Sequence, residues 1–380
     1  MNMEFKRKLP TPQTIRDMYP VSPELARQKQ ANDRAVRDVL TGEDNRLMLL
    51  IGPCSADRED AVLDYVTRLR GLQEKVKDKI LLVPRVYSNK PRTTGDGYKG
   101  MLHQPDPNGD PDILKGLIAT RKMHIKVLEQ TGFSGADELL YPENCLYLSD
   151  ILSYVAIGAR SVEDQQHRLI SSGLDIPVGM KNPTSGDLTV MMNSIKAAQH
   201  GHTFLLSQWE VRSKGNPLAH AILRGSVNKC GRALPNYHYE DLSQLCELYG
   251  KSGLENPAVI IDTNHSNSGK QWDQQARIAK EVLHSTRHSG DIHRMVSDPL
   301  KVLGDHQQVH GVFCVVLGVP DGENELFPDA GKVVVHHVII GHHFPCFLFV
   351  LAHEGVNGLR DHGDGRLGHV GKVPDVLSRL

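Results

Sequence analysis

The sequence has little net charge, no long hydrophobic run and no paired spacing of cysteines. Its formal net charge is −1 over 380 residues, so the overall charge favours neither nucleic acid nor a membrane surface as a partner. The longest apolar stretch, residues 344–352, is too short to span a bilayer. No apolar segment follows the first basic residues, so no signal peptide is indicated. We therefore expect no nucleic-acid or membrane partner.

The cysteines are few for a chain of this length, and they are scattered. They stand at positions 54, 145, 230, 246, 314 and 346. In a large chain this pattern favours reduced thiols over a disulfide framework, and therefore a cytoplasmic location. The length permits one large domain with extensions, or two domains.

What the sequence does contain is an alternation of short apolar runs with amphipathic stretches. It begins at residue 46, after a polar, proline-punctuated segment in which Ser22 and Pro23 predict a helix over 23–40. The apolar runs predict strands over 47–52, 80–86, 136–140, 155–159, 176–180, 219–224 and 257–262. The amphipathic stretches predict helices over 58–76, 112–130, 146–153, 163–172, 187–199, 239–251 and 270–286.

This alternation indicates an α/β fold with parallel strands and right-handed crossovers. We treat a further apolar run at 203–206 and the strand at 219–224 as one interrupted position, with an insertion at 208–218 between them. Seven strands then predict a (β/α)8 TIM barrel whose eighth unit is missing or replaced. The expected organisation is an N-terminal extension over 1–45, a barrel over 46–296 and a different segment over 297–380.

Six basic residues stand at or near the ends of these apolar runs. They are Arg85, Lys90, Arg92, Arg160, Lys181 and Arg224. In a parallel barrel, the carboxyl ends of the strands meet at one face, so these charges should gather there. Cations held close together repel one another unless anions are bound between them. The pattern therefore predicts a site for phosphorylated or carboxylated small molecules.

Three further positions near these cations allow two interpretations each. The motif Lys90-Pro91-Arg92-Thr93-Thr94 is a phosphate-binding loop or a solvated basic turn. Glu138 ends the third strand, where it orients a Lys or Arg of the site or forms an ordinary salt bridge. Asn182 is a hydrogen-bond donor of the site or a turn residue. Lys99, by contrast, is expected to be solvated.

A cysteine and a histidine follow the first and seventh strands. Cys54 lies in I-G-P-C-S at 51–55, and His265 lies in D-T-N-H at 262–265. Only the eighth strand separates the first and seventh strands of such a barrel, so the two side chains would be close enough to share a divalent ion. The alternative is that Cys54 is simply a small buried residue. Oxygen ligands normally complete a site of this kind.

Seven motifs in order resemble the class I 3-deoxy-D-arabino-heptulosonate 7-phosphate (DAHP) synthases, the first enzymes of the shikimate pathway. They are I-G-P-C-S at 51–55, R-V-Y at 85–87, K-P-R-T-T at 90–94, G-A-R at 158–160, G-M-K-N at 179–182, I-L-R-G at 222–225 and D-T-N-H-S-N-S at 262–268. The resemblance implies a transferase that condenses phosphoenolpyruvate with erythrose 4-phosphate. It also implies a metal-dependent TIM barrel and a homo-oligomer, either a dimer or a tetramer.

The resemblance further implies a role for each matching residue. The residues that would hold phosphoenolpyruvate are Arg85, Arg160, Lys181 and Arg224, and those that would hold erythrose 4-phosphate are Lys90, Pro91, Arg92 and Thr93. Cys54 and His265 would bind a divalent ion of the Mn, Fe, Co or Zn type. Lys90 or Lys181 would move protons during the reaction.

The resemblance ends near residue 296. The family continues into an eighth strand with a glutamate and later an aspartate, its two remaining metal ligands, whereas nothing over 297–380 fits. Nine of the twenty histidines but only two alanines lie there. Three accounts are open: a shifted reading frame, a different C-terminal module, or a replacement strand that ends in Glu354. The metal site is therefore expected to be incomplete.

Two other functions remain compatible with the sequence. One is a catalytically defective barrel that still binds phosphoenolpyruvate. The other is a different phosphoenolpyruvate-condensing synthase, of the 3-deoxy-octulosonate 8-phosphate or sialic acid type. The K-P-R-T-T motif favours the heptulosonate enzymes over these.

Overall fold

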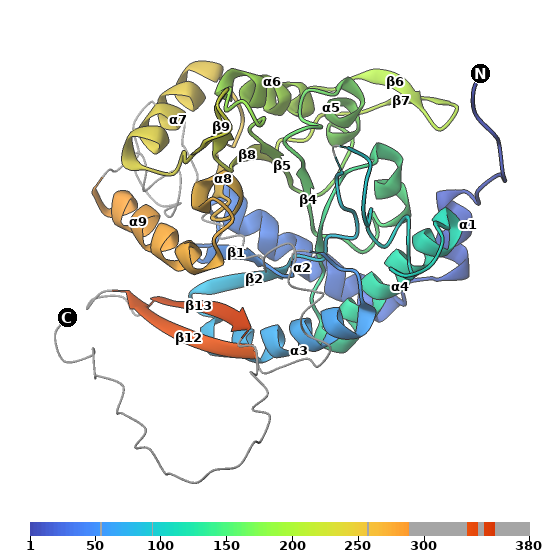
Figure 1. Ribbon diagram of the computed structural model, residues 1–380, viewed down its shortest axis with the longest axis horizontal. Coiled ribbons are helices and arrows are strands. Elements are labelled where there is room, and N and C mark those ends of the chain that lie inside the picture. The colour runs from blue at the N-terminus through green and yellow to red at the C-terminus, as the bar shows by residue number, and fades with distance from the viewer. Residues whose placement is uncertain (54, 93, 257, 289–332, 341–345, 354–380) are drawn as a thin grey trace, which may run out of the picture.

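Seven parallel strands form the wall of a barrel (Figure 1). The computed structural model describes residues 1–53, 55–92, 94–256, 258–288, 333–340 and 346–353. Strand β1 (Leu47–Ile51) pairs with β2 (Ile80–Pro84), and a bridge from Arg85 to Ala136 links β2 to the other five strands. These are, in spatial order, β3 (Ala136–Glu138), β4 (Tyr154–Ile157), β5 (Val178–Lys181), β8 (Ala219–Leu223) and β11 (Val259–Ile261). The seven predicted strands are confirmed, and their ends differ from the predictions by no more than two residues.

Helices cover the outer face of this wall (Figure 1). The six that match predictions are α3 (Glu59–Val76), α4 (Ile113–Thr131), α5 (Gln165–Ser171), α6 (Leu188–Gln199), α7 (Tyr239–Ser252) and α9 (Gln275–His288). The helix predicted over 146–153 is wrong. A 3-10 helix, η1 (Pro142–Tyr147), and further turns stand there. Cys145, Leu148 and Ile151 are buried at a spacing of three, which suits bonds from residue i to i+3 rather than an α-helix.

The strands bury one side chain inward and the next outward. In β1, Met48 and Leu50 belong to a cluster inside the barrel, whereas Leu49 and Ile51 pack against the surrounding helices. Strand β4 alternates in the same way, with Tyr154 inside. This alternation follows from the pleat of a strand, and both faces are apolar because both are buried.

The N-terminal segment contributes to the core of the barrel. It contains α1 (Pro12–Met18), which was not predicted, and α2 (Pro23–Thr41), which was. The hydroxyl of Ser22 caps α2 by accepting from the backbone N–H of Leu25 at 3.2 Å. Three residues of α2, Val36, Val39 and Leu40, join the cluster inside the barrel. The segment precedes the first strand, as expected, but its second helix is not outside the main fold.

The run at 203–206 does not belong to the barrel, and the prediction of one interrupted strand is wrong. β6 (Thr203–Leu206) pairs antiparallel with β7 (Trp209–Arg212), and this hairpin projects beyond α5 (Figure 1). Ser207 and Gln208 have φ of 47° and 70°, as a two-residue hairpin turn requires. A second small hairpin, β9 (Ser226–Val227) and β10 (Ala233–Leu234), follows β8.

After β11 come a single helical turn, α8 (His265–Ser268), the 3-10 turn η2 (Trp272–Gln274) and then α9. Beyond α9 the described residues form β12 (Val333–Ile340) and β13 (Cys346–His353), which pair antiparallel with each other. Within the described residues β13 therefore does not take the eighth place in the barrel. The remaining residues of the expected C-terminal segment, Glu354 included, lie outside the described residues.

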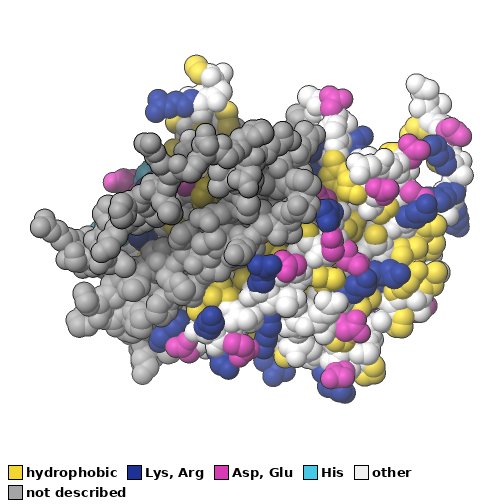
Figure 2. Space-filling view, turned by 60° about the horizontal axis from the view of Figure 1, so that its bottom comes forward, with side chains coloured by type: hydrophobic (Ala, Val, Ile, Leu, Met, Phe, Trp, Pro, Cys, Tyr) yellow, Lys and Arg dark blue, Asp and Glu magenta, His cyan; other side chains and the backbone are white. Residues whose placement is uncertain are grey.

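The described surface shows no segregation of charge on the face in Figure 2, where basic and acidic side chains are interspersed. That pattern agrees with the net charge of −1. None of the helices in the described part of the chain is long and apolar enough to cross a membrane.

Candidate active site at the carboxyl ends of the strands

Along each strand the inward-facing side chains are apolar, but the next inward-facing position, at the carboxyl end, is polar. Val83 of β2 and Ile222 of β8 lie inside the barrel, and Ile260 of β11 does too. The residues two positions after such inward positions point to the same side, because side chains alternate with a period of two. They are Arg85, Glu138, Arg224 and Asp262, with Lys181 completing the ring on β5. One end of the barrel thus collects three cations and two carboxylates.

We call Arg85, Lys181 and Arg224 the inner cations. Their exposed fractions are only 7, 4 and 8%. The ammonium of Lys181 lies 3.3 Å from a carboxylate oxygen of Glu138, so the contact that both interpretations of Glu138 required is present. Tyr87, which the sequence analysis missed, lies beneath two of these charges: the guanidinium of Arg85 is 4.0 Å from its ring centre and the ammonium of Lys181 is 5.5 Å away.

These charges keep one another ionised in spite of burial. Burial by itself would raise the pKa of Glu138, but the electrostatic interactions with Lys181, His265 and Arg85 outweigh it and lower that pKa. Burial would lower the pKa of Lys181, yet the negative charge of Glu138 and other neighbours raises it. The pair is therefore a carboxylate and an ammonium at neutral pH.

Arg224 differs from Lys181 because no carboxylate pairs with it directly among the described residues. Burial lowers the pKa of Arg224, although the charge of Asp262 opposes that effect. Its Nη1 atom is buried and makes no hydrogen bond within the part of the chain that the structure describes. Such an atom carries a desolvation cost that an anionic ligand would relieve.

His265 and Asp262 form the other charged contact of the site. Nδ1 of His265 lies 2.7 Å from Oδ2 of Asp262, whose side chain is fully buried. Burial would raise the pKa of Asp262, but the hydrogen bond and electrostatic interaction with His265 and the charges of Lys181 and Arg224 lower it. A carboxylate that accepts from Nδ1 leaves the lone pair of Nε2 for another ligand, the usual arrangement of a histidine that binds metal.

The other predicted metal ligand, Cys54, lies outside the described residues. Within the described residues no group of three or more His, Cys, Asp and Glu side chains forms a metal site. The donor chemistry of His265 fits a divalent ion.

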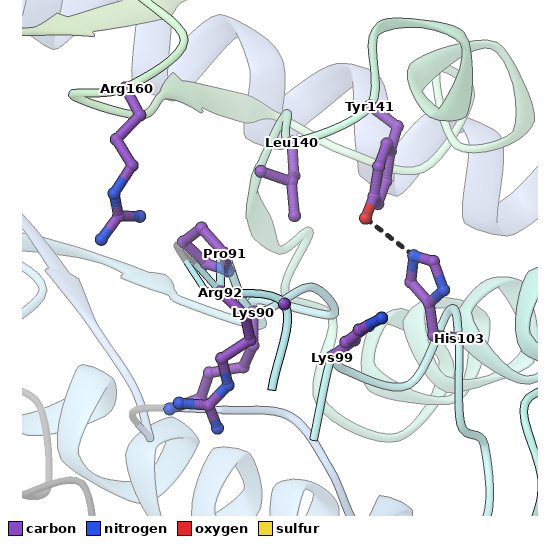
Figure 3. A pocket seen from close by; sticks show the side chains of 9 residues that line it. Lys90, Pro91, Arg92, Lys99, His103, Leu140, Tyr141 and Arg160 are labelled. Carbon is purple, nitrogen blue, oxygen red and sulfur yellow. Dashed lines mark hydrogen bonds between the residues drawn. The ribbon is translucent and has the colours of Figure 1, made fainter. Parts of the chain in front are cut away.

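A cavity of about 320 Å³ lies beside the inner cations and opens to solvent. It is lined by Lys90, Pro91, Arg92, Gly95, Lys99, His103, Leu140, Tyr141 and Arg160, as Figure 3 shows. We call Lys90, Arg92, Lys99 and Arg160 the rim cations. No carboxylate lines the cavity among the described residues. Four positive charges around one cavity indicate an anionic ligand.

One expectation for this cavity concerns Lys99. Lys99 was expected to be solvated, and it lines this open cavity at a half-exposed position. The backbone N–H of Lys90 donates to the carbonyl of Lys99 at 3.1 Å and joins the two segments. Gly100 makes this approach possible: its φ is +99°, and a Cβ there would lie 2.5 Å from the carbonyl oxygen of Ser88.

His103 and Tyr141 were missed altogether. The Nε2 atom of His103 lies 2.7 Å from the hydroxyl oxygen of Tyr141 (Figure 3), and burial, followed by the charge of Lys99, lowers the pKa of His103. Tyr141 follows a strand end, but an isolated histidine in a loop gives no signal in the sequence.

The structure thus brings most of the predicted residues into two adjoining groups. Arg85, Glu138, Lys181 and Arg224 lie inside the barrel mouth, and His265 lies beside them. Lys90, Pro91, Arg92 and Arg160 line the cavity, and the charge of Arg160 acts on Arg224. Thr93 falls outside the described residues.

Comparison with known proteins gives a consistent result. Residues 19–289 match the DAHP synthetase I family. The Tyr-sensitive phospho-2-dehydro-3-deoxyheptonate aldolase of Escherichia coli K12 is 36% identical over 280 residues, covering 72% of this chain and 76% of the relative. The Trp-sensitive enzyme of Enterobacter agglomerans is 37% identical over 277 residues, covering 72% and 77%.

A solved structure supports the same assignment. The phospho-2-dehydro-3-deoxyheptonate aldolase of Francisella tularensis SCHU S4 has a TM-score of 0.71 and 28% sequence identity, covering 82% of this chain and 86% of its own. Fold, sequence match and relatives agree: this chain belongs to the DAHP synthetase I family, whose members are transferases built on an α/β barrel.

Proposed function

We propose that this chain condenses phosphoenolpyruvate with erythrose 4-phosphate to give DAHP and inorganic phosphate, the first step of the shikimate pathway. The observation that carries the proposal is the pair of adjoining cationic groups, one buried and one open. A reaction between two phosphorylated molecules needs two anion sites that share a boundary. Family membership supports the same reaction.

The inner cations suit phosphoenolpyruvate, which carries a carboxylate and a phosphate on one carbon. Arg85 and Arg224 present guanidinium groups, which bind such oxygens in pairs. Lys181 adds a third charge, and Arg160 lies at the boundary with the cavity. A small rigid anion of this kind matches a rigid, buried set of charges.

The cavity suits erythrose 4-phosphate. Lys90 and Arg92 lie on the loop after β2, and Nε of Arg92 donates to the carbonyl of Tyr98 at 2.8 Å, which fixes the start of the guanidinium. The remaining donors of the guanidinium would bind the phosphate. Pro91 stiffens the loop between the two cations, and the proposal gives Thr93 a hydroxyl contact to the same phosphate.

In the proposed reaction, C3 of phosphoenolpyruvate attacks the aldehyde carbon of the sugar, water adds at C2, and the bond from C2 to the phosphate oxygen breaks. The oxygen of the former aldehyde takes up a proton. We propose Lys181 as its donor, because Glu138 keeps the ammonium charged. Lys90 is the alternative donor, on the sugar side.

A divalent ion of the Mn, Fe, Co or Zn type would polarise the aldehyde when bound. Cys54 and His265 are the residues that we propose as its ligands. Asp262 would hold the imidazole of His265 in the correct tautomer and orientation. The cytoplasm is the expected compartment, and a homo-oligomer the expected assembly, which light scattering would test.

A second candidate function is binding of phosphoenolpyruvate without turnover. It is favoured by the point at which the family match stops, residue 289, before the segment where the family's last two metal ligands would lie. Arg85, Lys181 and Arg224 all precede that point.

One pair of experiments distinguishes the two functions. Calorimetry of the full chain should detect binding of phosphoenolpyruvate. An assay of phosphate release with phosphoenolpyruvate, erythrose 4-phosphate and Mn²⁺ should measure turnover. Turnover on the order of 1–10³ per second supports synthase activity. Binding with background turnover supports the second candidate, and the absence of binding by folded protein contradicts both.

A further inference from the structure

Three asparagines from three separate segments of the chain meet behind Arg224. Asn182 follows β5, Asn236 follows β10 and Asn267 lies in α8. Asn182 is completely buried and Asn267 is 5% exposed. Their side chains bind backbone groups at the carboxyl end of β8, where Arg224 and Gly225 stand.

Asn182 uses both ends of its amide. Its Oδ1 accepts from the backbone N–H of Arg224 at 2.9 Å and from Nδ2 of Asn236 at 3.1 Å. Its Nδ2 donates to the carbonyls of Gly225 and Pro183, each at 2.9 Å. An amide offers two donor hydrogens and two acceptor lone pairs, so all four are used here.

The other two asparagines complete the network. The Oδ1 atom of Asn236 accepts from the N–H of Gly225 at 2.7 Å, and the N–H of Asn236 donates to Oδ1 of Asn267 at 2.9 Å. The Nδ2 atom of Asn267 donates to the carbonyls of Leu223 and Asp262, at 3.2 and 2.8 Å. The network therefore ties the ends of β8 and β11 together.

Gly225 lets the asparagines come this close. Its φ is +73°, and a Cβ there would lie 2.8 Å from the carbonyl oxygen of Leu234 and 2.9 Å from the backbone nitrogen of Asn267. A side chain at this position would push the network apart. The carbonyl of Arg224 is held as well, because the N–H of Ser266 donates to it at 3.2 Å.

The backbone of Arg224 is thus fixed on both sides, while the Nη1 atom at the far end of its side chain has no hydrogen-bond partner among the described residues. Lys181, in contrast, is oriented through its own side chain by Glu138. For Arg224 the position of the charge depends on the backbone that carries it. A misplacement of about 1 Å is enough to cost a large factor in a site of this kind.

We propose that Asn182, Asn236 and Asn267 are positioning residues that hold Arg224 for an anionic ligand. The inference rests on the proposed function, because phosphoenolpyruvate is the ligand that Arg224 would bind. It answers the question that the sequence left open for Asn182, which is more than a turn residue.

The test is binding of phosphoenolpyruvate to the full chain by calorimetry, which needs no turnover. Asn182→Ala should weaken binding about tenfold or more. Asn216→Ala is the matched control. Asn216 is also a buried asparagine with three hydrogen bonds to backbone groups, but it lies before the amino end of β8, away from the site. Asn216→Ala should lower the melting temperature and leave the affinity for phosphoenolpyruvate within about twofold of that of the parent chain.

A double-mutant cycle separates positioning from general damage. In an Arg224→Ala background, which already removes the guanidinium, Asn182→Ala should have no further effect on the affinity for phosphoenolpyruvate. An equal loss in both backgrounds would overturn the proposal. If Asn182→Ala does not fold, Asn236→Ala, at a half-buried position, takes its place in the same cycle.

The outcomes distinguish this inference from the proposed function. If the parent chain binds phosphoenolpyruvate and the asparagine variants bind it equally well, the inference fails and the proposed function stands. If the folded parent chain does not bind phosphoenolpyruvate, both fail.

Discussion

The inner cations and the rim cations carry the same kind of charge in different surroundings. Lys181 is 4% exposed and lies 3.3 Å from Glu138, whereas Arg92 is exposed and is held through a backbone carbonyl. A buried charge must have its partners built into the fold, because water cannot replace them. An exposed charge can adjust to its ligand. The inner cations therefore support the barrel as well as the ligand, whereas the rim cations serve mainly the ligand.

The largest expected effect comes from breaking the inner ion pair. Glu138→Leu should lower the free energy of unfolding by about 3–5 kcal/mol, because it leaves the ammonium of Lys181 buried without its carboxylate. Urea unfolding would measure this. Asp64→Asn, which breaks the exposed pair of Asp64 with Arg68, is the control and should change stability far less.

The double variant Glu138→Leu/Lys181→Met separates the effect of this ion pair on stability from its effect on binding. It should recover much of the lost stability, since removal of both charges of a buried pair is often neutral. It should not recover binding of phosphoenolpyruvate. If it did, Lys181 would have no role in the site.

The next effect concerns the rim. Arg92→Ala should raise the Michaelis constant for erythrose 4-phosphate, or the dissociation constant if turnover is low, by a factor equivalent to about 2–3 kcal/mol. The value for phosphoenolpyruvate should change much less, and the melting temperature should stay nearly constant. Equal losses for both substrates would contradict the division into two sites. Salt should weaken binding at the rim more than at the inner cations, because exposed charges are screened.

A lower pH should destabilise the protein through a histidine buried inside the barrel. His220 is buried inside the barrel, where it contacts the hydroxyl of Tyr154 at 2.9 Å, and burial lowers its pKa to about 4. The unfolded chain binds a proton near the ordinary pKa of about 6.5, so stability falls as the pH drops from that value toward 4. Between pH 7.5 and 5 this histidine should account for a loss of about 2 kcal/mol.

The test for His220 compares the loss of unfolding free energy between pH 7.5 and 5 in two proteins. Urea unfolding at both pH values should show a smaller loss for His220→Gln than for the parent chain. The same loss in both proteins would mean that other groups cause the acid sensitivity.

The smallest effect is expected for the contact between His103 and Tyr141 in the cavity wall. Tyr141→Phe removes the hydrogen bond to His103, which lies at a partly exposed position, and should cost less than about 1 kcal/mol of stability. Any change in binding should appear for erythrose 4-phosphate and not for phosphoenolpyruvate. A larger change for phosphoenolpyruvate would place the pair in the wrong site.

Much of this site was accessible from the sequence because it depends on local patterns. The alternation of apolar runs and helices gave the seven strands, and the cations at their ends gave the face that binds anions. Inward and outward positions follow from the period of two along a strand. Asp262 illustrates what this reasoning missed: it stands two residues after inward-facing Ile260, in a motif that was inspected only for its histidine.

Other features depended on contacts between residues far apart in the chain. The hairpin β6–β7 was mistaken for part of a barrel strand, since an apolar run looks the same in either place. The segment 146–153 was predicted as an α-helix, but it begins at the end of η1 and continues in turns with hydrogen bonds between residues three apart. Only the tertiary contacts separate these alternatives.

The positions of the barrel strands, to within two residues, and the identity of the charges follow from the sequence, because each is encoded in a run of neighbouring residues. The tertiary structure alone sets which groups meet: the carboxylate of Glu138 with the ammonium of Lys181, 43 positions apart, and the amide of Asn182 with the backbone N–H of Arg224, 42 positions apart. These contacts form when the strands assemble side by side and bring their carboxyl ends together. The chemistry of the residues was present in the sequence, but their arrangement was not.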